Sequence, residues 1–307
     1  MPSKNIRLRA LAALLLAALF SIALPGGSTA ADLMVTGGTR WQATQQPGVG
    51  AQQKKVPILM YHHLYQGEET VPNAISVDQF AEEMAFLDQQ GYTTVSFRQL
   101  INYVEKGWPL PRKPVCITFD DGYLSNYQLA FPILQEYKMQ ATIFAIGWSV
   151  GATDTYKDTQ YPITPHFDVS QAKEMVDSGL VSIQTHTYDM HQNEAYETGD
   201  KVRRTILKLP NETEEEYKAA LTADITRARE ELEAATGEAV NALAYPLGAW
   251  DERSDQILEE LGIQVTVTTQ PGTATLVRGD LESLRSLPRY GVGSTTTLAE
   301  FAALVRG

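Results

Sequence analysis

Two acids and two histidines in this chain could form a metal-dependent hydrolytic site. Asp120 and Asp121 are adjacent, and His186 and His191 follow later in the sequence. A divalent metal takes deprotonated nitrogen or oxygen ligands, and three protein ligands with one open position are typical of a catalytic site. Asp121, His186 and His191 would provide such a set and leave Asp120 to transfer a proton. The five-residue separation of the histidines is not helical spacing, so we expect them on an irregular loop.

The acidic pair follows a run of β-branched and aromatic residues. Val115 to Phe119 predicts a buried strand that ends at Asp120 and Asp121. Successive side chains of an extended chain point in opposite directions, which would let one Asp hold a metal while the other moves a proton. The pair alone could also form a turn or cap a helix near Ser125. The two histidines make a metal site the stronger interpretation.

Apolar periodicity predicts that strands and helices alternate through most of the chain. The expected strands span residues 58–61, 93–96, 115–119, 141–146, 181–184, 242–245, 263–268 and 289–292. The expected helices span residues 76–90, 97–106, 123–137, 169–178, 252–261 and 298–305, with a long helix that begins at Thr213. This alternation indicates an α/β fold, a distorted (β/α)7-type barrel in a single domain. Chemistry in such barrels occurs at the carboxyl ends of the strands, where His62, the acidic pair and His186 all lie.

The amino-terminal region has the pattern of an exported protein. Residues 1–30 combine basic residues, an apolar run from Leu11 to Leu24 and small residues at Ser28 and Ala30, which is typical of a cleaved signal peptide. The run is shorter than the roughly 20 residues that span a bilayer, although an uncleaved anchor is an alternative. Residues 31–54 have the composition of a flexible linker, and residues 55–307 would form the folded domain.

Charge and cysteine content restrict the partners of this chain. Removal of residues 1–30 would change the formal net charge from -12 to -15, because that segment contains three basic residues and no acid. Such acidity argues against a nucleic-acid partner and favours a neutral or cationic substrate. The single Cys116 cannot form an internal disulfide, so it is expected to be a small buried side chain. We expect a secreted or envelope-associated monomer with no transmembrane helix after signal cleavage.

These segments resemble the motifs of polysaccharide deacetylases with a NodB-homology domain, carbohydrate esterase family four. Residues 118–122 match the first motif, whose first Asp is the base and whose second Asp binds the metal. The segment that begins at His186 matches the second motif, and its two histidines complete the metal triad. Residues 245–248 match part of the third motif, a wall of the substrate groove formed here by Tyr245, Pro246 and Leu247. The resemblance covers residues 56–305 and implies that the Leu247 N–H holds the oxyanion.

The resemblance also implies one divalent metal ion, zinc, with cobalt or nickel as alternatives. This sequence departs from the family motifs in three places. The histidine spacing is five rather than four, as in the branch similar to exported poly-β-1,6-N-acetylglucosamine deacetylases. The arginine that starts the third motif is replaced by Ala244, and Arg289 is a candidate substitute or simply a structural charge. The family's usual general-acid histidine near the carboxyl terminus is absent, because no histidine follows His191. The same branch supplies this histidine from the first strand, so the resemblance implies His62, or else His63.

The implied function is hydrolysis of acetyl groups, N-acetyl or O-acetyl, on an acetylated polysaccharide, with an N-acetylglucosamine polymer favoured. One alternative is an inactive glycan-binding envelope protein, which Ala244 suggests. Another is a serine hydrolase, because residues 147–151 fit the G-x-S-x-G pattern around Ser149. That pattern requires a following helix, which residues 152–164 do not predict. Three aromatic residues near the motifs could stack on sugar rings or pack in the core: Tyr123, Tyr188 and Trp250.

Overall fold

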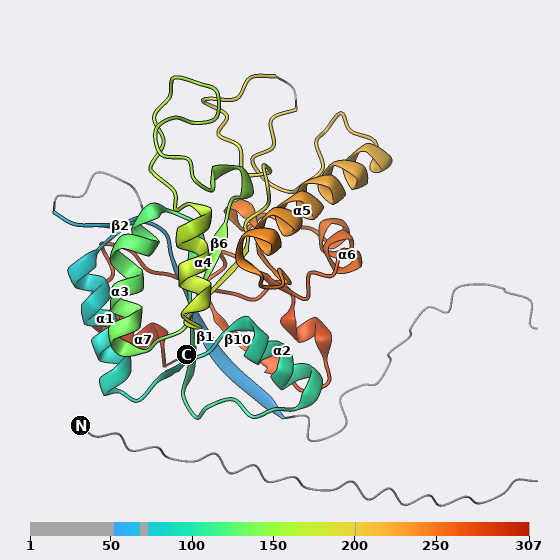
Figure 1. Cartoon of the computed structure of the whole chain (residues 1–307). Helices are drawn as coiled ribbons and strands as arrows, with labels where there is room; N and C mark the ends of the chain where they lie inside the picture. Colours follow the sequence, from blue (N-terminus) through green and yellow to red (C-terminus); the bar gives the residue numbers. More distant parts are fainter. Residues whose placement is uncertain (1–51, 68–72, 200, 307) are drawn as a thin grey trace, which may run out of the picture. The chain divides into compact units, whose positions relative to one another are not determined.

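A curled, mostly parallel sheet forms the centre of the domain (Figure 1). The computed structural model describes residues 52–67, 73–199 and 201–306, all within one unit of residues 46–307. The expected signal peptide and most of the expected linker lie outside the described residues. The first strand begins at Gln53, inside the range expected for the linker.

Seven strands form one hydrogen-bonded path in the order β10-β1-β5-β6-β7-β8-β9. Every neighbouring pair on this path is parallel except β1 with β10. The strands are β1 (Gln53–Tyr61), β5 (Pro114–Asp121), β6 (Ala141–Ala145), β7 (Val181–Thr185), β8 (Ala242–Ala244), β9 (Val265–Val267) and β10 (Thr273–Val277). Two short strands join this sheet, β4 (Thr93–Thr94) on β5 and β11 (Tyr290–Gly291) on β1, while β2 (Leu64–Tyr65) pairs with β3 (Ile75–Ser76).

The segment from Leu287 to Gly291 bridges the two edges of the curled sheet at its carboxyl end. Leu287 forms a parallel bridge with Val267 of β9, and β11 pairs in parallel with β1. The structure therefore confirms a single α/β domain with a barrel-like curl, in the form of a half-barrel. The antiparallel strand β10, which pairs with the first half of β1, was not expected from the sequence.

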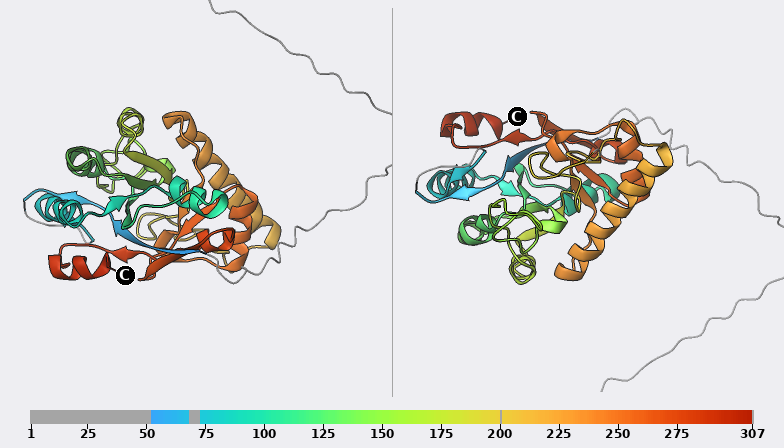
Figure 2. Two further views of the ribbon diagram at one scale, coloured as in Figure 1. Left: turned by 90° about the horizontal axis from the view of Figure 1, so that it is seen from below. Right: turned by 90° about the horizontal axis from the view of Figure 1, so that it is seen from above.

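Seven α-helices surround the sheet among the described residues, close to their expected positions. They are α1 (Val77–Gln89), α2 (Phe97–Lys106), α3 (Phe131–Tyr137), α4 (Val169–Asp177), α5 (Glu214–Thr236), α6 (Glu252–Glu260) and α7 (Leu298–Leu304). Ser76, Asp168 and Thr213 cap their helices through side-chain oxygens, as their sequence positions predict. The expected helix over residues 123–137 instead contains a π-helical turn, Asn126–Ala130, before α3. Figure 2 shows α5 and α7 at opposite ends of the domain.

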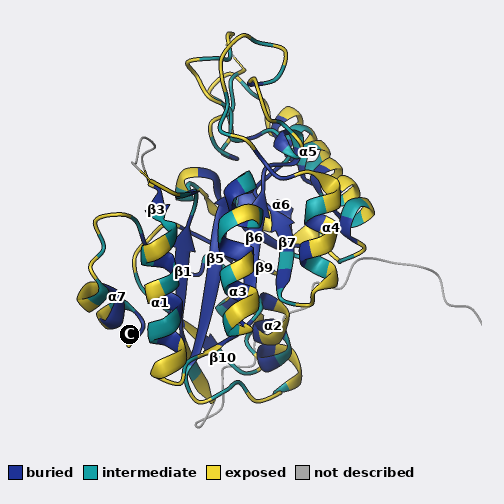
Figure 3. Cartoon of the chain, turned by 60° about the vertical axis from the view of Figure 1, so that its left-hand side comes forward, coloured by how far each residue is buried: buried dark blue, intermediate teal, exposed yellow. Residues whose placement is uncertain are grey.

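The two faces of β5 pack against different parts of the core. Ile117 and Phe119 belong to the apolar cluster that includes residues of α1, α3 and α4, the helices in front of the buried strands in Figure 3. Cys116 belongs to a second cluster on the other face of the strand. Because side chains alternate along a strand, Thr118 and Asp120 share the face of Cys116. The alternation thus directs Asp120 into the interior of the curled sheet.

A buried acid links α1 to β1 and to the segment that follows β11. Glu83 is 1% exposed and accepts hydrogen bonds from the Tyr61 hydroxyl at 2.6 Å and the Gln79 amide at 3.1 Å. The same Gln79 amide donates to the carbonyl oxygens of Gly293 and Thr296. Burial raises the pKa of Glu83 to about 7, although the two hydrogen bonds oppose the shift. Gln79 and Glu83 therefore couple the position of residues 293–296 to α1.

Replacing Glu83 with Gln should change how stability depends on pH. A carboxyl group whose pKa is higher in the folded state than its ordinary 4.5 binds its proton more tightly when folded. The wild-type free energy of unfolding should therefore fall as pH rises from about 4.5 through about 7. Relative to Glu83→Gln, wild type should lose roughly 2 kcal/mol between pH 5 and pH 8, measured by urea denaturation. Parallel pH profiles for the two proteins would contradict this.

Candidate active site

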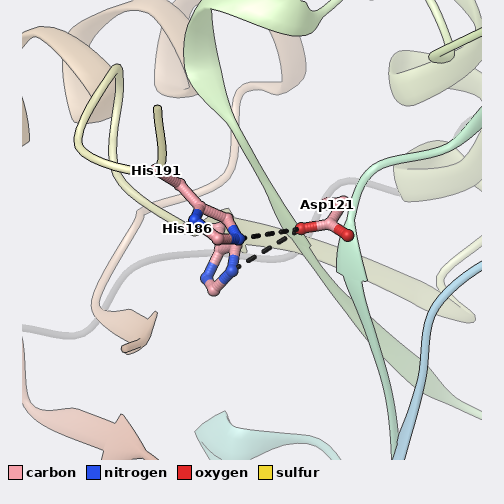
Figure 4. Close-up of side chains that lie close together, drawn as sticks. All are labelled: Asp121, His186 and His191. Atoms are coloured by element: carbon pink, nitrogen blue, oxygen red, sulfur yellow. Dashed lines mark ion pairs between the residues drawn. The ribbon is translucent and has the colours of Figure 1, made fainter. Parts of the chain in front are cut away.

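Asp121, His186 and His191 converge at the carboxyl end of the sheet. Asp121 is the last residue of β5, His186 directly follows β7, and His191 lies on the loop beyond it. The Oδ1 atom of Asp121 is 3.6 Å from Nε2 of His186 and 4.0 Å from Nε2 of His191 (Figure 4). Their potential ligand atoms all lie within 4.8 Å of one another. The structure brings together the three residues predicted to hold a metal.

The surroundings of the two histidines suit a metal. Nδ1 of His186 is 2.7 Å from the carbonyl oxygen of Ala244, and Nδ1 of His191 is 3.3 Å from that of Arg204. These acceptors place the proton on Nδ1 and leave the Nε2 lone pairs facing Asp121. Burial lowers the pKa of His186 to about 4, which keeps this imidazole neutral. Two imidazoles and one carboxylate form a donor set that fits zinc, and also cobalt or nickel.

Both carboxylates of the acidic pair line the same cavity, which differs from the expectation that they point in opposite directions. The reason is the backbone at Asp121, whose φ is 72°. A positive φ is uncommon outside glycine and interrupts the alternation of an extended chain. Burial and the nearby Asp121 carboxylate raise the pKa of Tyr123 above its ordinary value. The strand end thus turns Asp121 towards the histidines while Asp120 remains in the sheet interior.

Asp120 forms a buried, two-pronged ion pair with Arg289. Nη1 and Nη2 of Arg289 each lie 2.7 Å from one carboxylate oxygen of Asp120, and the arginine is 0% exposed. Arg289 also donates to the carbonyl of Thr268 and the hydroxyl of Thr118. Burial alone would raise the pKa of Asp120, but Arg289 holds it well below the usual range. Arg289, which reaches the site from the segment before β11, thus contacts the carboxylate predicted to be the base.

Removing one partner of this pair should destabilise the fold strongly. Arg289→Ala leaves a buried carboxylate without its cation, which typically costs about 3–5 kcal/mol. The double variant Asp120→Asn/Arg289→Ala should be more stable than Arg289→Ala, because the uncompensated charge is gone. Chemical denaturation of the four metal-free proteins of this cycle measures the coupling. Additive effects would show that the two side chains do not stabilise each other.

His62 lines the cavity that contains the metal-binding set, whereas His63 forms contacts elsewhere. The cavity has a volume of about 470 Å³, and residues of the segment 291–296 form part of its wall. Nδ1 of His63 instead lies 2.9 Å from the Ser125 hydroxyl, and its ring packs edge-on against Tyr123. Of the two histidines considered for the general acid, the geometry favours His62.

The third-motif segment forms another wall of this cavity. Leu247 is 53% exposed, lies in the short 3-10 turn Pro246–Gly248 and has a φ of 55°. Gly248 is required in this turn, since its φ is 70° and a Cβ atom would come 2.1 Å from Oγ1 of Thr269. Tyr245 also lines the cavity, but its hydroxyl donates to Asp255, and Pro246 is buried. The turn therefore presents Leu247 to the cavity on a constrained backbone.

A second cavity of about 460 Å³ adjoins the first and was not predicted from the sequence. Asp121, His191 and Leu247 line both cavities. The remaining wall comes mainly from residues 146–166, residues 192–196 and Arg204. It contains the aromatic residues Tyr123, Trp148, Tyr156 and Tyr196. The tyrosines and tryptophan in these segments were the sequence feature that could have predicted this cavity, because loops so rich in aromatic residues often line binding sites.

The other two aromatic candidates pack against neighbouring side chains. The Tyr188 ring lies 3.8 Å from the guanidinium carbon of Arg227, and Trp250 stacks on Tyr245 with ring centres 5.8 Å apart. Ser149, the candidate for a serine nucleophile, is 1% exposed and donates its hydroxyl to the carbonyl of Ile146. The next α-helix begins only at Val169, so residues 147–151 do not form a strand-turn-helix elbow.

Comparison with known proteins identifies the class to which this fold and site belong. The family model of polysaccharide deacetylases matches residues 108–266, just over half of the chain. Bacillus subtilis YxkH, which is named for the same family, is 30% identical over 239 residues, a match that covers 78% of this chain and 71% of YxkH. The chain belongs to the polysaccharide deacetylase family.

More specific relatives are named as poly-β-1,6-N-acetyl-D-glucosamine N-deacetylases. The Escherichia coli K12 protein is 29% identical over 236 residues, which cover 72% of this chain but only 34% of that relative. The Staphylococcus epidermidis protein is 27% identical over 223 residues, with 72% and 71% of the two chains covered. The solved structure of IcaB from Ammonifex degensii aligns with a TM-score of 0.65 at 27% identity, over 84% of this chain and 98% of IcaB. The curled sheet of this protein is thus shared with deacetylases.

Proposed function

We propose that this protein is a metal-dependent deacetylase that removes N-acetyl groups from a poly-β-1,6-N-acetylglucosamine polysaccharide. One observation carries the proposal: Asp120, held by Arg289, lies beside the set Asp121, His186 and His191 in a cavity that His62 also lines. This arrangement offers a base, a metal site and an acid around one space, which is what amide hydrolysis requires. An ester, as in O-acetylated glycans, would present the same carbonyl and is the alternative substrate.

The bound metal ion would supply Lewis acidity that polarises the acetyl carbonyl and lowers the pKa of a water molecule. Asp120 would accept the proton of the attacking water. Each of its oxygens retains a lone pair beyond the one used by Arg289, and Arg289 keeps the group ionised and oriented. The Leu247 N–H would stabilise the oxyanion, and His62 would donate a proton to the departing sugar nitrogen. The products are acetate and a free amine.

The shape of the site supports a polymeric substrate. The two adjoining cavities, about 470 and 460 Å³, are each in the size range of small-ligand sites and share residues at the metal set. Aromatic side chains line the second cavity, and the C–H groups of a sugar ring pack on aromatic rings. We therefore propose that residues flanking the cleaved acetyl group extend into the second cavity.

Export of the protein is part of the proposal. The signal-like pattern of residues 1–30 supports secretion or attachment to the cell envelope, where such a polymer would be found. Within the described ranges, no helix has the length and apolar character needed to cross a bilayer. We further propose that residues 31–54 act as a linker and that the mature protein works as a monomer.

The inactive glycan-binding alternative rested on Ala244, the position at which the resemblance implies an arginine. The structure weakens this argument, because Arg289 makes a two-pronged contact with Asp120 from another segment. A pure binder would also have no need of a buried base beside a metal-binding set. Failure of the metal-loaded protein to release acetate from any acetylated glycan would restore this alternative.

Asp120→Asn should abolish most catalysis in the protein that folds, and it should also lower stability, because Arg289 loses its buried counter-charge. A general base typically contributes about 100- to 10,000-fold, so kcat for acetate release from β-1,6-linked N-acetylglucosamine oligomers should fall within that range. Metal content should remain unchanged, since Asp121 and both histidines are intact. Asp177→Asn, on the exposed side of α4, is the matched control and should behave like wild type. Full activity in Asp120→Asn would rule out the proposed mechanism.

Metal removal should separate this mechanism from serine catalysis. Dialysis against a chelator should abolish acetate release, and added Zn²⁺ should restore it, because the metal supplies the Lewis acid. Ser149→Ala should retain activity, since the hydroxyl is buried and already paired with Ile146. Activity that survives chelation but disappears in Ser149→Ala would instead identify a serine hydrolase.

A further inference from the structure

The loop between the two metal-binding histidines lacks regular structure, so something else must fix its shape. It links His186 at the end of β7 to His191, and its residue Thr187 has a φ of 74°. The carbonyls of Thr187 and Tyr188 accept hydrogen bonds from the backbone N–H groups of Gly147 and Trp148, at 3.0 and 3.1 Å. These contacts hold one side of the loop. The N–H groups of Tyr188 and Asp189 need partners on the other side.

Asp224 of α5 supplies both of these partners. Its Oδ1 accepts from the Tyr188 N–H at 2.8 Å, and its Oδ2 accepts from the Asp189 N–H at 2.7 Å. Two successive backbone donors are thus held by the two oxygens of a single carboxylate. Hydrogen bonds to an ionised acceptor are shorter and about twice as strong as neutral ones. The contact therefore fixes both the position and the rotation of the loop.

Two more side-chain contacts between α5 and this loop surround the carboxylate. Met190 is 3% exposed and packs in the apolar cluster that contains Leu221 and Ile225 of α5. One turn further along the helix, the guanidinium of Arg227 lies over the Tyr188 ring at 3.8 Å. Tyr188 and Asp189 are therefore bound directly to α5, and Met190 packs in an apolar cluster to which this helix contributes. His191 follows immediately. The position of α5 determines where the second histidine can be.

We propose that Asp224 is a positioning residue for the metal site: it orients the loop that carries His191, and so sets the affinity for the metal. The inference rests on the metal site of the proposed function. Partners that orient metal ligands typically change metal affinity about 10- to 100-fold when removed. An asparagine cannot replace this aspartate, because its single oxygen satisfies one N–H and its amide faces the other. The unpaired N–H would release that part of the loop.

The test is Zn²⁺ affinity, measured by competition with a chromophoric chelator, for the full-length mature protein. Asp224→Asn should bind about 10- to 100-fold more weakly than wild type. Asp224→Glu keeps both carboxylate oxygens but places them one methylene further from the helix. Its Zn²⁺ affinity should lie between those of wild type and Asp224→Asn. Glu230→Gln removes a carboxylate from an exposed position on the same helix and should match wild type. Amide hydrogen exchange at residues 188 and 189 should be faster in Asp224→Asn.

The outcomes distinguish this inference from the proposed function. A wild-type protein that binds no divalent metal would overturn the metal site and this inference together. Wild-type binding with equal affinity in Asp224→Asn would overturn only the role of Asp224. If Asp224→Asn does not fold, Asp224→Glu replaces it in the test. Equal Zn²⁺ affinity of Asp224→Glu and wild type would then overturn the role of Asp224. The metal-free Asp224→Asn protein could also melt at a lower temperature than wild type while its Zn²⁺ affinity is unchanged. That result would show that the contact only stabilises the fold.

Discussion

The buried ion pair between Asp120 and Arg289 is the interaction on which the rest of the site depends. It places a charged carboxylate in the interior of the curled sheet, where an unpaired charge would be strongly unfavourable. The ion pair also requires the segment before β11 to cross from β9 to β1. This segment pairs with β9 at Leu287, and β11 pairs with β1. The same contact therefore connects the two edges of the half-barrel and keeps the Asp120 carboxylate ionised.

Around this pair, each member of the metal set is oriented by a neighbour rather than by its own strand alone. The two histidines have carbonyl partners on Nδ1, and a positive φ at Asp121 turns its carboxylate towards them. The loop between the histidines is bound to α5 and to the end of β6. Such outer contacts limit the movement of the ligands, which is how a fold prepares a metal site before the ion arrives.

Much of the fold and the core of the site followed from local sequence signals. Alternating apolar patterns located the strands of the sheet, capping residues such as Asp168 and Thr213 marked helix starts, and the family motifs pointed to Asp120, Asp121, His186 and His191. The features that were missed depend on contacts between distant residues. No local sequence pattern predicts three of these features. They are the positive φ at Asp121, the antiparallel strand β10, and the hydrogen bonds from residues 188 and 189 to Asp224. The sequence left two interpretations of Arg289 open, a substitute for the missing motif arginine or a structural charge. It could not decide between them, because Asp120 lies far away in the sequence.

The late position of Arg289 in the chain has a consequence for biosynthesis. All of the metal set and the carboxylate of Asp120 are synthesised before the residue that neutralises Asp120. A nascent or truncated chain that ends before Arg289 would have to bury an uncompensated charge to close the sheet, which is unfavourable. The site can therefore be completed only after the chain has been synthesised through Arg289.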